Sequence, residues 1–165
     1  MANENTTKYY SSRQEKLVAS TLGWNVVTGS GSRSFFPGDV EADFWLGECK
    51  TYQTPGHKVR FKLADWRKIK FEAVSKNKFP VLFTDDGSQT ANRTWCMFPQ
   101  VVDSDIIKQY EVTDLDHAAS VTSSSIAINK EEESKSNLLI ACKIECQPLF
   151  ISKLSVFNEI MFGGN

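Results

Sequence analysis

Residues 36–50 read FPGDVEADFWLGECK, and this stretch decides the fold of the chain. A carboxylate, Asp39, comes directly after a Pro-Gly turn, and a second carboxylate, Glu48, follows nine residues later. Side chains alternate between the two faces of a strand, so Glu48 and Lys50 share one face. A hairpin that closes over this stretch brings Asp39 close to the Glu48 and Lys50 end of its second strand.

Apolar residues on both sides of a short break predict that hairpin. Val40 and residues 44–46 have strand character, and residues 41–42 form a polar and small break between them. Three consecutive apolar residues at 44–46 indicate a strand that is covered on both faces. Charged residues also decorate exposed hairpins, which is the simpler interpretation. A covered strand favours a site instead, because buried charges need partners.

Two carboxylates beside an ammonium group suit a divalent metal ion and a phosphodiester. Mg²⁺ prefers oxygen ligands, keeps several waters and accepts phosphate oxygens as further ligands. A bound metal ion polarises the phosphoryl group and lowers the pKa of a coordinated water. A lysine beside it can orient that water and offset charge that develops on the phosphate.

Asp39 followed by Glu48-Cys49-Lys50 resembles the motif of the PD-(D/E)XK nuclease superfamily, with Gly38 in place of the usual proline. The upstream segment 28–33, TGSGSR, is similar to the loop that precedes the metal-binding aspartate in archaeal and phage Holliday junction resolvases of that superfamily. The resemblance covers roughly residues 12–85.

The resemblance implies a Mg²⁺-dependent DNA endonuclease, with Mn²⁺ as a possible substitute, that cuts branched DNA as a homodimer and leaves a 5′-phosphate. It implies that Asp39 and Glu48 hold the metal ion and that Lys50 serves the attacking water. A glutamate on the first helix also reaches the metal in such resolvases, which makes Glu15 a third metal ligand and catalytic candidate. Glu15 also has a structural explanation, since it completes a capping box with Ser12.

The distribution of charge is uneven, although the net charge is only −1. Residues 50–80 hold nine Lys or Arg and two acidic residues, whereas residues 101–135 hold eight acidic and three basic residues. This asymmetry predicts one basic face for phosphates. Two simpler interpretations stay open: each lysine is solvated on its own, and the Gly/Ser segment is a flexible connection between two strands. The candidate DNA contacts are Ser30, Ser32, Arg33, Lys58, Arg60, Lys62 and Lys68.

The order of elements predicts an α/β (α+β) fold. We expect helices at 12–22 and 64–76, and strands at 24–28, in the hairpin, at 79–84 and at 94–98. Gly23 ends the first helix. This αβββαβ order is that of the restriction-endonuclease-like fold, in which helices flank a mixed β-sheet that carries the site at one edge.

The C-terminal third is predicted less sharply, as a β/α extension. A short helix at 103–110 and a polar loop at 114–125 precede two strands, 125–129 and 137–144, on either side of a charged hairpin tip. A closing helix covers 149–162. We expect one nuclease domain over residues 1–165, with a core at about 12–98 and an extension at 99–165 that extends the sheet, forms a dimer interface or selects substrate.

Composition places limits on the class of protein. The chain has 165 residues, and it contains neither an apolar run of membrane-spanning length nor the hydrophobic segment of a signal peptide. We therefore expect a cytoplasmic protein with no membrane partner and with four reduced cysteines, located in the host cytoplasm if the protein is viral. The small size and unusual C-terminus suit a phage protein that acts in DNA recombination.

Three other functions fit the same residues. The first is a sequence-specific or nicking nuclease of the same fold, because a fold does not determine its substrate. The second is a non-catalytic DNA-binding module that retains the fold. The third is a structural or interaction protein, with a solvated hairpin and no metal ion.

Overall fold

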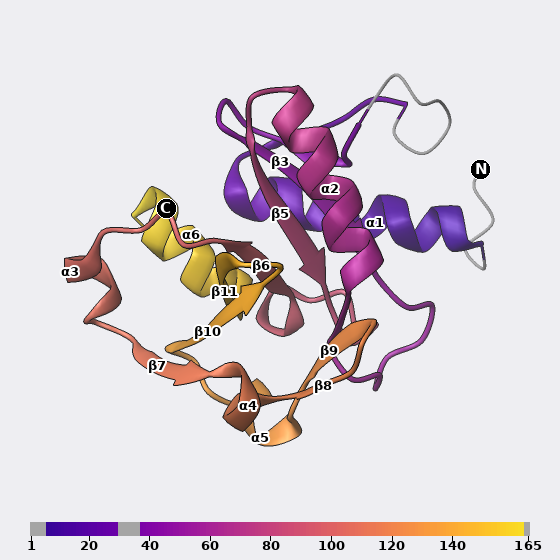
Figure 1. Cartoon of the computed structure of the whole chain (residues 1–165). Helices are drawn as coiled ribbons and strands as arrows, with labels where there is room; N and C mark the ends of the chain where they lie inside the picture. Colours follow the sequence, from indigo (N-terminus) through magenta and orange to yellow (C-terminus); the bar gives the residue numbers. More distant parts are fainter. Residues whose placement is uncertain (1–5, 30–36, 164–165) are drawn as a thin grey trace.

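A computed structural model describes residues 6–29 and 37–163 (Figure 1). An eight-stranded mixed sheet forms the centre, in the order β1-β2-β3-β5-β6-β11-β10-β7, and a three-stranded sheet, β4-β9-β8, packs beside it. The strands of the larger sheet are β1 (Asn25–Val26), β2 (Val40–Glu41), β3 (Trp45–Lys50), β5 (Phe79–Thr84), β6 (Trp95–Pro99), β7 (Glu111–Asp114), β10 (Leu138–Ile144) and β11 (Gln147–Lys153).

The remaining elements cover this sheet or connect its strands. The smaller sheet contains β4 (Arg60–Lys62), β8 (Ala119–Val121) and β9 (Ser125–Ile128). The longer helices are α1 (Thr7–Leu22), α2 (Leu63–Ser75) and α6 (Leu154–Phe162). The short helices are η1 (Ala91–Arg93), α3 (Ser104–Ile107), α4 (Leu115–Ala118) and α5 (Lys130–Glu133). The chain is therefore a mixed α/β protein, as its sequence predicts.

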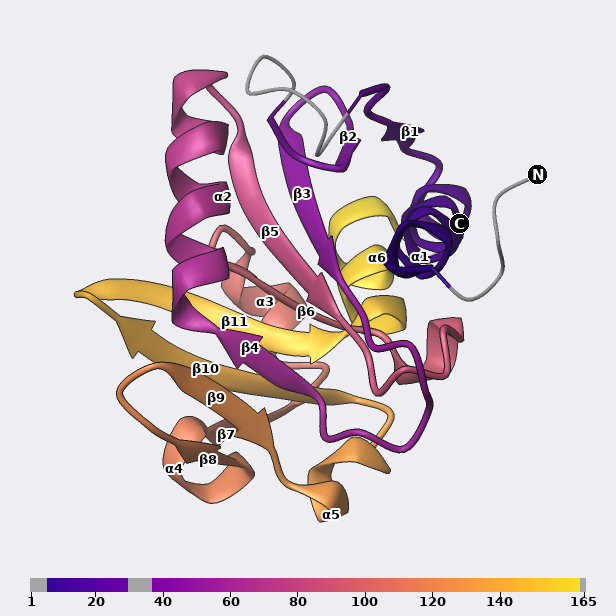
Figure 2. The ribbon, with the colours of Figure 1, turned by 90° about the vertical axis from the view of Figure 1, so that its right-hand side faces the viewer.

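Helices cover both faces of the large sheet. Figure 2 shows α2 on one side of β5 and β3, and α1 and α6 on the other. On the α2 side, Leu46 and Leu82 pack with Trp66 and Ile69 of the helix. On the opposite side the core is aromatic, and the Phe157 ring of α6 meets several rings edge to face. Apolar side chains of β3 and β5 thus face both helix layers, as the apolar runs at residues 44–46 and 79–83 predict.

The first helix begins earlier than the sequence predicts. Its N-cap is Thr6, whose hydroxyl accepts a hydrogen bond from the Tyr9 N–H at 3.3 Å. The predicted cap at Ser12 is wrong, because Thr6 provides the hydroxyl in an extended conformation and the helix then continues through Ser12. The predicted end is confirmed, since Gly23 adopts a left-handed φ of 70° there.

The central hairpin closes as predicted. Val40 of β2 pairs with Gly47 of β3 in antiparallel register, so Asp39 comes level with the Glu48 end of the strand. The strand is buried from Trp45 to Cys49. Phe44 is 71% exposed, so its predicted burial is wrong. It precedes the strand, where its carbonyl oxygen accepts a hydrogen bond from the Phe79 N–H at 2.8 Å.

The C-terminal third extends the large sheet, and three local predictions there are wrong. The predicted helix at 149–162 begins only at Leu154, because residues 147–153 form β11 between β6 and β10. The predicted hairpin around residues 131–135 does not form, since β9 and β10 belong to different sheets and α5 connects them. The predicted loop at 114–125 contains α4 and β8.

Candidate active site

A cleft of about 780 Å³ lies where β3 ends, between α1 and the segment that follows β1. Glu48, Cys49 and Lys50 enter it from β3, and Asp39 enters it from the turn before β2. The other residues that line it come from α1, from the end of β1 and from α2: Lys8, Ser11, Ser12, Glu15, Val26, Val27, Thr28, Gly29 and Lys68. The four catalytic candidates of the sequence analysis thus line one cavity.

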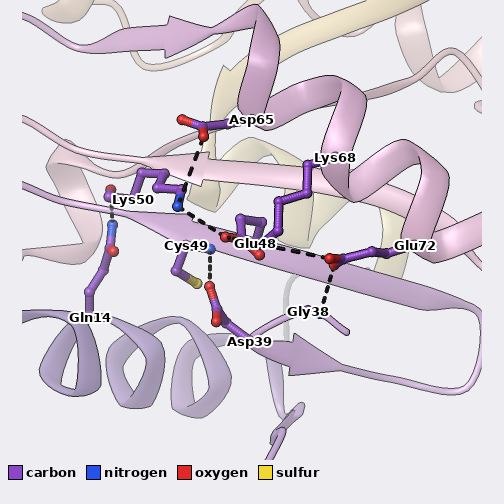
Figure 3. A network of polar contacts seen from close by, with 9 residues as sticks. All are labelled: Gln14, Gly38, Asp39, Glu48, Cys49, Lys50, Asp65, Lys68 and Glu72. Atoms are coloured by element: carbon purple, nitrogen blue, oxygen red, sulfur yellow. Dashed lines mark hydrogen bonds and ion pairs between the residues drawn. The ribbon is translucent and has the colours of Figure 1, made fainter. Parts of the chain in front are cut away.

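Glu48 is almost fully buried, with 4% of its surface exposed, and two ammonium groups hold it. Its Oε1 lies 3.0 Å from the Lys50 Nζ and 3.1 Å from the Lys68 Nζ. Figure 3 shows both lysines reaching this carboxylate, Lys50 from the same strand and Lys68 from α2. Both lysines contact Oε1, and Oε2 makes no hydrogen bond or ion pair with the residues that the structure describes.

Asp39 is fixed to β3 through its backbone and its side chain. Its N–H donates to the Gly47 carbonyl oxygen at 2.8 Å, and its Oδ2 accepts from the Cys49 N–H at 2.8 Å. Its own carbonyl oxygen accepts from the Val27 N–H at 2.8 Å. These bonds hold the carboxylate beside the strand that carries Glu48 (Figure 3).

Glu72 links the two halves of the cluster, and the sequence analysis did not identify it. Its Oε2 accepts a hydrogen bond from the Gly38 N–H at 2.9 Å, directly before Asp39. Its Oε1 lies 3.6 Å from the Lys68 Nζ, which in turn contacts Glu48. The spacing of four residues between Lys68 and Glu72 on one helix predicts their pairing. Nothing in the sequence predicts the contact with Gly38, thirty-four residues away.

Burial and the other carboxylates change the proton affinity of Glu15. Half-burial on α1, followed by repulsion from Asp39 and then Glu48, raises the pKa of Glu15 from 4.5 to about 7. Three acidic side chains therefore interact electrostatically across this cleft. A divalent cation would relieve that repulsion.

Lys50 remains an ammonium group near neutral pH. Desolvation disfavours its charge, but attraction from Glu48, then from Asp65 and Asp39, outweighs desolvation and raises the pKa of Lys50. The Asp65 Oδ1 lies 3.9 Å from the Lys50 Nζ. The backbone is fixed as well, since Nε2 of the buried Gln14 donates to the Lys50 carbonyl oxygen at 2.5 Å. Neither Gln14 nor Asp65 has a signal in the sequence.

The candidate DNA contacts are not all at the cleft. Lys68 lines it. Lys58, Arg60 and Lys62 are exposed on and beside β4, where Phe61 points into the core, and they do not line the cleft. Ser30, Ser32 and Arg33 lie outside the residues that the structure describes.

The donor set fits magnesium if the substrate completes the coordination. Among residues 6–29 and 37–163, no three His, Cys, Asp or Glu side chains are already arranged to hold a metal ion. Mg²⁺ usually takes only one or two carboxylates and completes its shell with waters and phosphate oxygens. Asp39 and Glu48 supply the two carboxylates, and Glu15 can supply a third when it is ionised.

The comparisons with known proteins give no relative for this chain. No family model, curated protein or solved structure matches it. No helix in the described part of the chain is long and apolar enough to cross a membrane.

Proposed function

We propose that this protein is a Mg²⁺-dependent endonuclease that hydrolyses phosphodiesters in DNA. The observation that carries the proposal is that Asp39, Glu48 and Lys50 line one cleft, with Glu15 coupled to both carboxylates. The proposal includes a restriction-endonuclease-like arrangement of the N-terminal elements. It also includes a cytoplasmic location.

Asp39 and Glu48 hold the metal ion in this proposal, and Glu15 completes the set. The chemistry that a bound Mg²⁺ supplies is polarisation of the phosphoryl group and a lower pKa for a coordinated water. In the metal-free protein Lys50 carries a positive charge, because the attraction of Glu48 raises its pKa. It therefore orients the water and balances negative charge that develops on the phosphate.

Lys68 has a related role. Its side chain is 53% exposed at the cleft, and its ammonium group already contacts Glu48 at 3.1 Å. When a phosphate enters, Lys68 can transfer its hydrogen bonds to the phosphate oxygens and leave Glu48 to the metal ion. Glu72 acts only through others, since it positions Lys68 and the turn at Gly38.

Branched DNA is the proposed substrate, and a homodimer the proposed form. Two strands related by a twofold axis must be cut together, which a symmetric dimer achieves with two identical sites. A four-way junction, a flap and a linear duplex, each incubated with Mg²⁺, Mn²⁺ or EDTA, test this choice. Preferential cutting of the junction supports it, whereas cutting of linear duplex alone indicates the sequence-specific alternative.

The site itself is tested with Asp39→Asn and Lys50→Met. Each substitution should lower the cutting rate by about 100-fold or more, because Asp39→Asn removes a charged metal ligand and Lys50→Met removes a charge that acts on the reacting phosphate. Asp43→Asn is the matched control, since Asp43 is an exposed carboxylate on the same hairpin that does not line the cleft. Cutting that persists in both site variants refutes this site. A wild-type protein that binds DNA but cuts none with either metal ion is the binding module instead.

A further inference from the structure

A second cavity, of about 430 Å³, lies where β6 and β11 meet the segment before β4. Val59 of that segment and Trp95 of β6 contribute to its wall, and Lys153 enters from the end of β11. Arg93 from η1 and Lys130 from α5 add two further cations. None of these residues belongs to a motif that the sequence shows.

The charges of this pocket do not balance. Its two carboxylates already have partners, since the Asp86 Oδ2 lies 3.0 Å from the Arg93 Nη1 and the Glu133 Oε1 accepts from the Val59 N–H at 3.4 Å. Lys130 and Lys153 form no ion pair with any carboxylate that the structure describes. Three cations therefore face two carboxylates, and the excess charge is positive.

Lys153 is the cation that an anion would stabilise most. Its Nζ lies 6.0 Å from the centre of the Trp95 ring, at cation–π distance. Desolvation lowers the pKa of Lys153; attraction by Glu133 opposes it, and a weaker repulsion from Arg93 adds to it. A partly buried ammonium that forms no direct ion pair favours a bound anion.

The sheet register places this pocket in line with the cleft. Lys50 pairs with Thr84, Thr84 with Trp95, and Trp95 with Lys153. Residues that pair across neighbouring strands project from the same face of a sheet, so Lys50 and Lys153 share the α2 face. Three strand spacings of about 4.8 Å separate them by roughly 14 Å.

We propose that this pocket is a second phosphate site, which holds the backbone of the same DNA whose phosphodiester enters the cleft. The inference rests on the proposed function and adds a contact to it. Arg93, Lys130 and Lys153 hold one phosphate group roughly 14 Å from the scissile bond. The C-terminal third of the chain thereby takes part in binding the substrate.

The test is the double variant Lys130→Met with Lys153→Met, since methionine keeps much of the aliphatic stem and removes the charge. Binding of a fluorescent four-way junction is measured by anisotropy in EDTA, where metal-dependent cutting cannot occur, over a series of salt concentrations. We expect the variant to bind about tenfold more weakly, and the slope of log K against log salt to fall in magnitude by about one.

A matched control removes two lysines elsewhere. Lys108→Met with Lys143→Met takes the same charge from the residue that follows α3 and from the far end of β10, and should bind as the wild type does. Lys153→Arg keeps the charge and should also retain binding. Thermal melting verifies that each variant is folded.

The outcomes separate this inference from the nuclease proposal. Equal affinity in the pocket variant and the wild type overturns the second site, and so does an equal loss in the control variant. If the pocket binds free phosphate but not DNA, the pocket variant and the wild type also bind DNA with equal affinity. If the pocket variant binds DNA more weakly but no metal ion supports cutting by the wild type, the second site stands and the nuclease proposal falls.

Discussion

Glu15 shows the electrostatic repulsion between the carboxylates of the cleft, because its burial and that repulsion raise its pKa. Its pKa is about 7 in the folded protein, against 4.5 without the cleft around it. The folded state therefore binds the Glu15 proton more tightly than the unfolded state does. This contribution to stability is complete below about pH 4.5 and is lost as the pH rises through about 7.

Glu15→Gln should therefore stabilise the protein at high pH. The full shift corresponds to about 3 kcal/mol, and solvent screening of this half-buried group reduces the expected gain to about 1–2 kcal/mol. Urea denaturation of variant and wild type between pH 4 and pH 8.5 measures the difference in the free energy of unfolding. That difference should grow between about pH 4.5 and 7 and then level off.

Mg²⁺ provides the control for this experiment. At pH 8 a metal ion between the carboxylates should stabilise the wild type more than the variant and so reduce the advantage of glutamine. A difference that is constant with pH, or a variant less stable than the wild type at pH 8, contradicts the proposed repulsion.

The residues of the site differ in how far the sequence reveals them. The spacing within one hairpin predicts that Asp39 lies near Glu48 and Lys50, because antiparallel pairing determines which residues face each other. Gln14 and Glu72 reach the site from helices that are distant in the sequence. Their contacts depend on how α1 and α2 pack on the sheet, and local periodicity carries no information about that packing.

At the scale of elements, the turn before β2 depends on Gly38. This residue has a φ of 75°, and a Cβ added to it would lie 2.6 Å from Cδ1 of the buried Leu46. Gly23, at the end of α1, has nearly the same φ of 70° but open space around it. A side chain at either glycine would therefore strain the backbone to a similar degree. Only a side chain at Gly38 would also clash with Leu46.

Alanine at the two positions should separate these effects. Gly23→Ala should cost about 1–2 kcal/mol of stability, from left-handed strain alone. Gly38→Ala should cost about 1–3 kcal/mol more, because Leu46 must shift within a packed core. Urea denaturation measures both variants. Gly38→Ala should also lower the cutting rate, since Asp39 is the next residue, and equal effects of the two variants would contradict the clash.

The sequence correctly predicts the elements that have the same degree of burial along their whole length. Residues 79–84 form a strand covered on both faces, and their continuous apolar run indicates it directly. The same kind of run at 149–151 predicts a helix, because residues 154–161 continue it at helical spacing. Burial on both faces of β11 depends on β6 and β10, which the local pattern does not contain.

At the scale of the whole molecule, the order of strands sets how the C-terminal third relates to the site. β11 pairs with β6 and lies inside the sheet, although it belongs to the last twenty residues of the chain. Ile151 is fully buried there, between Met97 of β6 and Ile140 of β10. The extension therefore shares its core with the elements that carry Asp39 and Glu48.

Tryptophan fluorescence can test whether the chain unfolds as one unit, because all four tryptophans lie within residues 24–95. Ile151→Ala leaves a cavity in the shared core and should lower the free energy of unfolding reported by these tryptophans by about 2–4 kcal/mol. Val112→Ala, on the outermost strand β7 where Val112 is 48% exposed, is the control and should change it by less than about 1 kcal/mol.

If Ile151→Ala left the tryptophan transition in urea unchanged, residues 12–98 would fold independently. Any effect of the proposed second phosphate site on the cleft would then depend on the bound DNA alone. A shared transition means instead that the sheet which carries both proposed phosphate sites, about three strand spacings apart, unfolds as one unit.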